Sequence, residues 1–329
     1  MKTVLHQDRD LFVSLLQAAS EYLKIPLLLI EKDYYISLIL RKLSESAYRE
    51  QIVFKGGTSL SKGYHLIHRF SEDIDFAVIN IDMTGNQVKM LLSKLMKEIT
   101  VGFAEDTAFA DMSKGSMFRK QAFDYISSIG NSEYNLGNPI PSRIIVEISS
   151  FANPFPYEQR VIEPMVTTFL KEKELTQYLE AYKLTEFLLN VLSLRQTLCE
   201  KLVSLIRFSM SEDPIATLSG KIRHFYDIHA LLEEEEIRLY TQQNAFLLDI
   251  QRLIQHDQQI FTTPPQWQQL KSLKESPLLA NFETLWKQLH NVYIQNLSII
   301  AYREIPKPDE IATTLNTLIS TLAHVLIDD

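Results

Sequence analysis

The sequence has a single cysteine, Cys199, among its 329 residues, so it excludes an intramolecular disulfide and the small disulfide-rich folds that depend on one. Cys199 falls within an apolar helical pattern, which predicts a small buried hydrophobic side chain. The sequence also lacks a cluster of cysteine and histidine residues with the spacing of a zinc site.

Long hydrophobic runs are absent as well. The longest, IPLLLI at 25–30, is far shorter than the roughly 20 residues that span a bilayer. The opening MKTVLHQDRD, residues 1–10, meets acidic residues before any apolar stretch of signal-peptide length. We therefore expect a cytoplasmic protein that has no contact with a membrane.

The sequence also lacks an excess of positive charge. The chain has 33 Lys and Arg against 41 Asp and Glu, a formal net charge of −8, which argues against a surface that binds nucleic acid non-specifically. Basic residues are nevertheless crowded in one short stretch: Lys55, Lys62, His65, His68 and Arg69. If RNA binds, we expect it at that place.

What is present is the composition of an ordinary folded protein, 46% hydrophobic and 22% charged, in a chain long enough for two domains. Up to residue 185 the patterns alternate between helix and strand and predict an α+β domain with a mixed sheet and flanking helices. The expected helices are 9–24, 30–46, 58–67 and 86–99, and the expected strands are 51–57, 73–79, 121–129 and 143–151.

The last two expected strands are separated by a turn-rich segment, 130–142, and the proline-containing segment 151–164 reads as a boundary. Residues 186–329 are almost entirely helical in pattern, with a break at the pair Pro264 and Pro265. We therefore predict two domains, 1–185 and 186–329.

Two aspartates separated by one isoleucine mark the predicted strand 73–79. Because side chains alternate across a strand, Asp73 and Asp75 share one face and leave the other face apolar. Alternate residues of a strand are about 6 to 7 Å apart, so both carboxylates can converge on one divalent cation or bridge two. Two-metal sites of this kind serve in-line phosphoryl chemistry.

The turn just upstream supplies features of a phosphate site. Gly56 and Gly57 allow a close approach of the backbone, and the N-terminus of the following helix, capped by Thr58 or Ser59, attracts anions. Lys55, Lys62 and Arg69 add positive charge nearby. Each motif alone is compatible with a capped turn or with solvent-facing acids, whereas their joint order favours a phosphate and metal site.

These residues resemble a known family. The segment FKGGTSLSKGYHLIHRFSEDIDF (54–76), with EKDYY (31–35), LCEKLVSLIR (198–207) and RHFYDIHALL (223–232), is similar to the AbiEii-type nucleotidyltransferase toxins of toxin-antitoxin and phage-defence systems, which include the MenT-type toxins. The family belongs to the DNA polymerase β-like nucleotidyltransferase superfamily. The resemblance covers roughly residues 28–232. It implies that residues 1–185 form a nucleotidyltransferase domain.

The resemblance implies that the glycine block and the acids share one site. It places nucleotide-triphosphate binding on Gly57 and Ser59, within the turn and short helix that also hold Gly56, Thr58 and Lys62. It places Mg²⁺, with Mn²⁺ as the alternative, on Asp73 and Asp75. It further implies a nucleotide-binding serine just ahead of the acids, which falls on Ser71.

A third carboxylate is expected on a later strand. Glu147 alternates with Ile144, Val146 and Ile148, so it lies on the face opposite that apolar set, as a metal ligand requires. Asp124 in the preceding strand is the competing choice. A third alternative is that Glu147 is only a solvated surface residue.

Lys201 lies on an apolar helical stripe, formed by Leu194, Leu198, Leu205 and Phe208. A lysine on a buried face needs a partner, because desolvating an unpaired ammonium costs several kcal/mol. The resemblance implies that Lys201 contacts the nucleotide. The alternatives are that it reaches the surface or pairs with an acid.

Arg223 and Asp227 are one helical turn apart, which by itself predicts only a weak ion pair. The resemblance implies that both complete the active site, although relatives often carry an acid where His224 stands. In the EKDYY segment, Lys32 or Tyr35 can face the nucleotide pocket or pack under the sheet, and Tyr34 is expected to pack.

The function that follows from the resemblance is a Mg²⁺-dependent nucleotidyltransferase toxin. It would transfer nucleotide from a nucleoside triphosphate to an acceptor hydroxyl, at the 3′ end of tRNA, and so inhibit translation and growth. The alternatives are transfer to a protein hydroxyl, or a nucleotide- or antitoxin-binding module without catalysis. The expected partners are a nucleoside triphosphate, tRNA and a cognate antitoxin, with the domain 186–329 closing the cleft and contributing Lys201.

Overall fold

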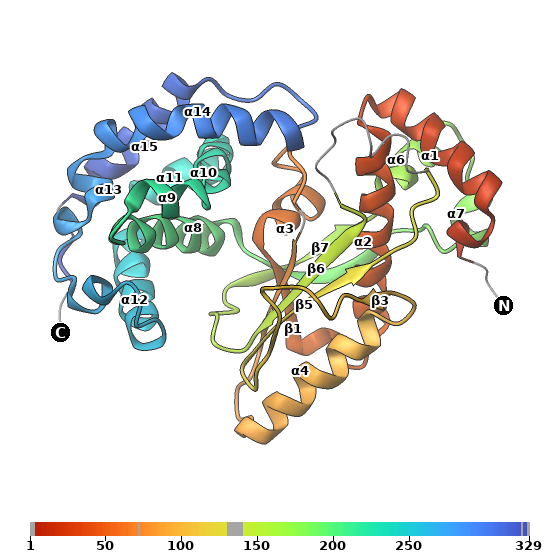
Figure 1. The fold of residues 1–329 in the computed structure, drawn as a ribbon, viewed down its shortest axis with the longest axis horizontal. Coiled ribbons are helices and arrows are strands. Elements are labelled where there is room, and N and C mark those ends of the chain that lie inside the picture. Colours follow the sequence, from red (N-terminus) through yellow and green to blue (C-terminus); the bar gives the residue numbers. More distant parts are fainter. Residues whose placement is uncertain (1–3, 72, 130–140, 324, 328–329) are drawn as a thin grey trace. The chain divides into compact units, whose positions relative to one another are not determined.

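The computed structural model describes residues 4–71, 73–129, 141–323 and 325–327. Its chain divides into two compact units, Met1–Leu192 and Ser193–Asp329, and each is described by itself (Figure 1). Most of the turn-rich segment expected at 130–142 lies outside the described residues.

The longer helices of the first unit follow the amphipathic segments that the sequence predicts. These are α1 (Arg9–Leu23), α2 (Leu27–Glu45) and α4 (Gly85–Ile99), and α4 begins with a capping box of Thr84 and Gln87. The short helix α3 (Gly56–Lys62) begins two residues earlier and ends sooner than predicted. The remaining helical segments are η1 (Leu5–Gln7), η2 (Arg49–Gln51), α6 (Met165–Glu172) and α7 (Gln177–Ala181).

One mixed sheet runs through the first unit. Within the described residues it has eight strands in the order β3-β5-β6-β2-β1-β8-β7, with β4 paired to β5. The pairs β2–β6 and β1–β8 are parallel and the others antiparallel. The strands are β1 (Ile52–Lys55), β2 (Asp73–Val78), β3 (Ala104–Glu105), β4 (Ser113–Lys114), β5 (Phe118–Asp124), β6 (Arg143–Ser149), β7 (Tyr157–Ile162) and β8 (Phe187–Leu192). The α+β class and the mixed sheet are as predicted.

Two predictions about local structure are wrong. The segment around Phe187–Leu192 was expected to be helical and is strand β8, and the expected boundary segment 151–164 contains strand β7. A short apolar run fits a buried strand and a helix equally well, and the pairing of β8 with β1 and β7 decides between them. The first unit therefore extends to Leu192.

The alternation expected for β2 and β6 is present. The apolar side chains on one face of the two strands are at most 1% exposed: Ile74, Phe76, Val78, Ile144, Val146 and Ile148. Helix α4 contacts β6, and α2 contacts β8 and α4. One face of these strands is thus closed by packing, which leaves Asp73, Asp75 and Glu147 half-buried on the other face.

The second unit is helical, as the sequence predicts. Helix α8 contacts α9 to α13, and α14 packs on α9 and α15. Trp286 of α14 packs against Phe225 and Tyr293, with ring centroids 5.2 and 5.6 Å away. The elements are α8 (Leu194–Ser209), α9 (Pro214–Ser219), α10 (Arg223–Glu233), α11 (Glu235–Thr241), α12 (Asn244–Ile260), η3 (Pro265–Gln269), η4 (Leu273–Glu275), α13 (Pro277–Ala280), α14 (Phe282–Ile300) and α15 (Pro308–Leu322).

In the part of the chain that the structure describes, no single helix has the length and apolar character needed to cross a membrane. Helices α1 and α2 meet that condition only together, as a pair bent by 115°.

Candidate active site

A row of four charged residues crosses the centre of the sheet on its half-buried face. The pairing register places Lys55 of β1 opposite Asp75 of β2, Asp75 beside Glu147 of β6, and Glu147 opposite Lys120 of β5. Asp73 lies on the same face, two residues along β2. Adjacent strands are about 4.8 Å apart and alternate residues about 6.6 Å, so the fold brings Asp73, Asp75 and Glu147 close together.

The glycine turn lies directly against these acids. Gly56 has φ +80°, and a Cβ atom added to it would stand 2.0 Å from Asp75 Oδ2. A Cβ on Gly57 would stand 2.7 Å from Arg69 Nη2 and 3.2 Å from Ser71 Oγ. Backbone therefore approaches the carboxylate of Asp75 at a distance that only glycine permits, and it lies close to the hydroxyl of Ser71.

The hydroxyls of Thr58 and Ser59 do not cap α3, which corrects the expectation from sequence. The helix begins at Gly56 with Lys55 as its N-cap residue and without a side-chain capping bond. Thr58 Oγ1 donates to the backbone oxygen of Asp73, and Ser59 Oγ donates to Gly56 O at 2.9 Å. Both hydroxyls are buried; that of Thr58 fastens the turn to the strand that carries the acids, and that of Ser59 closes the turn on itself.

The structure places Lys62 in a buried ion pair. Its Nζ atom lies 2.5 Å from Asp33 Oδ1, with side-chain exposures of 5% and 3%, and it also donates to Glu163 O at 3.0 Å. Asp33 Oδ2 in turn accepts from Met165 N at 2.7 Å. Lys62 thereby joins α3 to α2 and to the start of α6. Arg69 is also buried, so two of the five clustered basic residues do not lie on an open surface.

The other residues of the EKDYY segment are buried within the fold. Glu31 accepts from Ser127 Oγ and Ser128 N, both at 2.7 Å, and Lys32 Nζ donates to Pro141 O at 3.2 Å. The Tyr35 hydroxyl donates to Ile126 O, and its ring stacks on Tyr125 with centroids 4.2 Å apart. Tyr34 is 1% exposed and packs on Phe12, as expected.

Two predicted site residues form an ion pair inside the second unit. Lys201 Nζ of α8 lies 2.7 Å from Asp227 Oδ2 of α10, and the side chains are 6% and 0% exposed. An acid was one of the alternatives that the apolar stripe left open for Lys201. Arg223, the first residue of α10, is half-buried.

Asp124, the competing third carboxylate, lies at the far end of β5. It is in register with Arg143, whose Nε atom is 3.2 Å from Asp124 Oδ1. Glu147 instead shares a register position with Asp75. The sheet thus groups Glu147, rather than Asp124, with Asp75.

A match to a protein-family model shows the family of this chain. The model described as nucleotidyl transferase AbiEii toxin of type IV toxin-antitoxin systems matches residues 38–305, most of the chain. The chain belongs to the AbiEii nucleotidyltransferase toxin family. It is accordingly a nucleotidyltransferase with the predicted fold class.

Two solved structures that are similar to this AbiEii-family chain share little sequence identity with it. JHP933 from Helicobacter pylori is 17% identical, with a TM-score of 0.45 over 90% of this chain and 91% of the other. MenT4, a nucleotidyltransferase toxin from Mycobacterium tuberculosis, is 14% identical, with a TM-score of 0.43 over 89% and 85%. No curated protein matches the chain.

Nucleotidyl transfer by an AbiEii-family protein calls for a divalent metal, and the donor set fits one. Carboxylate oxygens suit Mg²⁺ and Mn²⁺, and Asp73, Asp75 and Glu147 supply them from one face. Yet among the residues the structure describes, no three His, Cys, Asp or Glu side chains are gathered into a ligand set. Glu147 is engaged elsewhere on this face, because its Oε1 atom is 2.9 Å from Lys120 Nζ.

Lys120 is the residue of this face that the sequence interpretation missed. Partial burial opposes its charged form, but the hydrogen bond and charge of Glu147, with the charge of Asp73, raise the pKa of Lys120 above its ordinary value. Lys120 is therefore a cation at neutral pH. The signal was available, because Lys120 alternates with Asp124, but the strand was expected to begin only at Gln121.

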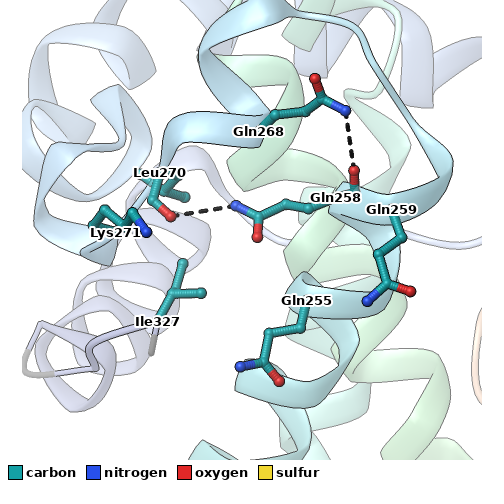
Figure 2. A pocket seen from close by; sticks show the side chains of 7 residues that line it. All are labelled: Gln255, Gln258, Gln259, Gln268, Leu270, Lys271 and Ile327. Carbon is teal, nitrogen blue, oxygen red and sulfur yellow. Dashed lines mark hydrogen bonds between the residues drawn. The ribbon is translucent and has the colours of Figure 1, made fainter. Parts of the chain in front are cut away.

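A cavity in the second unit is a less suitable active site. It has a volume of about 510 Å³ and is lined by Gln255, Gln258, Gln259, Gln268, Leu270, Lys271 and Ile327 (Figure 2). The amides bond within the wall: Gln258 Nε2 donates to Leu270 O at 3.2 Å, and Gln268 Nε2 donates to Gln258 O at 3.3 Å. Its lining has no carboxylate, and none of the predicted site residues is among it.

Proposed function

We propose that this chain transfers a nucleotide from a nucleoside triphosphate to the 3′ end of tRNA, with Mg²⁺ or Mn²⁺ held by Asp73, Asp75 and Glu147. The observation that carries the proposal is the contact between Gly56 and Asp75, which sets a glycine turn against a carboxylate on the acidic face. A phosphate on that turn would lie next to a metal held by the acids.

The chemistry forms one bond and breaks one. The acceptor hydroxyl oxygen attacks the α-phosphorus, the bond from that phosphorus to the bridging oxygen breaks, and pyrophosphate leaves with the electron pair. A carboxylate on the acidic face accepts the hydroxyl proton. A divalent metal held by Asp73, Asp75 and Glu147 would supply charge neutralisation for the phosphate.

The chain's own residues hold and orient the substrate. The backbone of Gly56 and Gly57, with Ser71 beside it, receives the phosphates, because no Cβ intervenes there. Thr58 keeps the turn in register with β2 through its hydroxyl bond to Asp73 O, and Ser59 holds the turn itself through its bond to Gly56 O. Lys62 acts on the same turn through Asp33, as a residue that positions α3.

For Lys201, Arg223 and Asp227 we propose a role in the same reaction from the second unit. Lys201 supplies an ammonium for the triphosphate, and Asp227 holds that ammonium in a defined place. Arg223, one helical turn before Asp227 on α10, supplies a second cation. The resemblance of their motifs to the family supports these roles.

The tRNA acceptor rests on the resemblance to the MenT-type toxins and on Lys55, a basic residue in register with the acidic face. As a member of a type IV toxin family, the chain would act in the cytoplasm, block translation, and be neutralised by a separately encoded antitoxin.

The test is transfer of label from each α-³²P nucleoside triphosphate to total RNA and total protein, with Mg²⁺ or Mn²⁺. We expect the label to appear on tRNA and to be removed by a 3′ exonuclease. With Asp73→Asn we expect no labelling of tRNA. Glu105→Gln, an acid of β3 paired with Lys114 at 2.6 Å, is the matched control. Label on protein, or equal labelling by Asp73→Asn, would overturn the proposal.

A further inference from the structure

Glu147 stands between a like charge and an opposite charge. On one side its register partner is Asp75 of β2, and on the other it is Lys120 of β5. The ion pair with Lys120 measures 2.9 Å, and each of the two side chains is 23% exposed. Like charges side by side on neighbouring strands are destabilising, so the ammonium offsets the repulsion between the two carboxylates.

The Glu147 carboxylate has two alternative interactions, one with a metal and one with Lys120. As a proposed metal ligand, Glu147 must direct an oxygen toward the cation that Asp73 and Asp75 hold. In the structure its Oε1 atom instead accepts from the Lys120 ammonium. A divalent cation and an ammonium beside the same carboxylate repel each other, so the two compete for it.

We propose that Lys120 is a positioning residue that takes the place of the metal beside Glu147, so that metal binding must open the Lys120–Glu147 ion pair. The inference rests on the proposed function, because it takes Asp73, Asp75 and Glu147 as the metal ligands. Lys120 thereby neutralises part of the charge of the acidic face until a metal binds, and it lowers the affinity of that face for metal.

The experiment measures Mn²⁺ binding to the full chain without nucleotide, from the loss of the electron paramagnetic resonance signal of free Mn²⁺. Lys120→Met keeps an unbranched side chain, one atom shorter, and removes its charge. We expect it to tighten Mn²⁺ binding by about tenfold, a typical coupling between two sites. Lys120→Arg retains the charge and is expected to bind Mn²⁺ as the wild type does.

The matched control is Lys114→Met. Lys114 lies on β4 next to β5 and pairs with Glu105 at 2.6 Å, so the change removes the same charge from the same sheet. We expect it to leave Mn²⁺ affinity unchanged within about twofold, as for an independent site. An equal gain in this control would show a general charge effect and overturn the inference.

A double-mutant cycle locates the effect at Glu147. In a Glu147→Gln background the competing carboxylate is gone, so adding Lys120→Met should change Mn²⁺ affinity by less than about twofold. A tenfold gain that persists in this background, or a loss of affinity in Lys120→Met alone, contradicts the proposal. A loss of nucleotide affinity with unchanged Mn²⁺ affinity also overturns it, because Lys120 would then bind substrate.

The outcomes separate this inference from the proposed function. A wild type that transfers label while Lys120→Met leaves Mn²⁺ affinity unchanged overturns the inference alone. A wild type that transfers no label and binds no Mn²⁺ overturns the proposed function and the inference with it. Unfolding midpoints of all variants show that each is folded under the conditions of the binding measurement.

Discussion

Gly56 and Asp75 are in such close contact that any side chain on Gly56 would collide with the carboxylate: an added Cβ atom would stand 2.0 Å from Asp75 Oδ2. The two residues belong to α3 and β2, and the contact sets the glycine turn directly against the acidic strand.

Gly56→Ala should therefore abolish transfer. The alanine must adopt a φ of +80° and displace Asp75, so we expect a loss of activity of at least about 100-fold, as for misplacement of a reacting group. Gly102→Ala is the matched control, because Gly102 has φ +89° and open space around it. Both variants should lose about 1 to 3 kcal/mol of stability from backbone strain, measured by urea unfolding, and only Gly56→Ala should lose transfer. Equal activities would contradict the close contact.

Glu147 and Asp124 should behave differently although both lie on the same face. Because Glu147 is in register with Asp75, Glu147→Gln should lower label transfer at least about 100-fold and weaken Mn²⁺ binding. Asp124→Asn disturbs a partly exposed pair with Arg143, worth about 0 to 1 kcal/mol, and should retain transfer. Initial rates of label transfer by the two variants distinguish these outcomes. If Asp124→Asn loses transfer and Glu147→Gln retains it, Asp124 is the third carboxylate.

Lys62→Met should act on stability more than on nucleotide binding. It leaves Asp33 buried without its cation, which costs about 3 to 5 kcal/mol for a buried pair. Lys183→Met, which breaks an exposed pair with Glu45, should cost about 0 to 1 kcal/mol. Urea unfolding measures both values. A folded Lys62→Met with a weakened nucleotide affinity would instead show direct contact with the substrate.

Lys201 and Asp227 allow stability and catalysis to be separated. Lys201→Met leaves the fully buried Asp227 carboxylate without the ammonium and should destabilise the second unit by about 3 to 5 kcal/mol. The double variant Lys201→Met, Asp227→Asn removes both charges and should regain much of that loss. If Lys201 serves the triphosphate, transfer stays low in the double variant. Recovery of both stability and transfer would assign the pair to the fold alone.

Cys199 should resist alkylation in the folded protein. Burial raises the pKa of its thiol to about 12, although the neighbouring Tyr240 hydroxyl opposes the shift. The reactive thiolate is therefore scarce in the native chain between pH 7 and 9, and iodoacetamide labelling should be slow there. Because this range lies well below the raised pKa, the slow rate should rise about tenfold per pH unit and should not level off near pH 8.5, as that of an ordinary thiol does. In urea the thiol regains an ordinary pKa and should react at once. Mass spectrometry of the labelled chain measures both rates.

Much of the fold could be predicted because its signals are local. The alternation in Asp73–Val78 and Arg143–Ser149 and the periodicity of α1, α2 and α4 each lie within one element. Strand β8 was missed because a short apolar run has no decisive period, and its partners β1 and β7 settle it.

By itself, the sequence determined which residues share a face and that a glycine turn precedes a pair of acids, since both follow from spacing along the chain. The tertiary structure decided which charge meets which. Asp33 with Lys62, Lys201 with Asp227, and Lys120 with Glu147 are pairs between separate elements. Spacing within an element cannot specify such partners, because they depend on strand register and helix packing, which only the assembled fold sets.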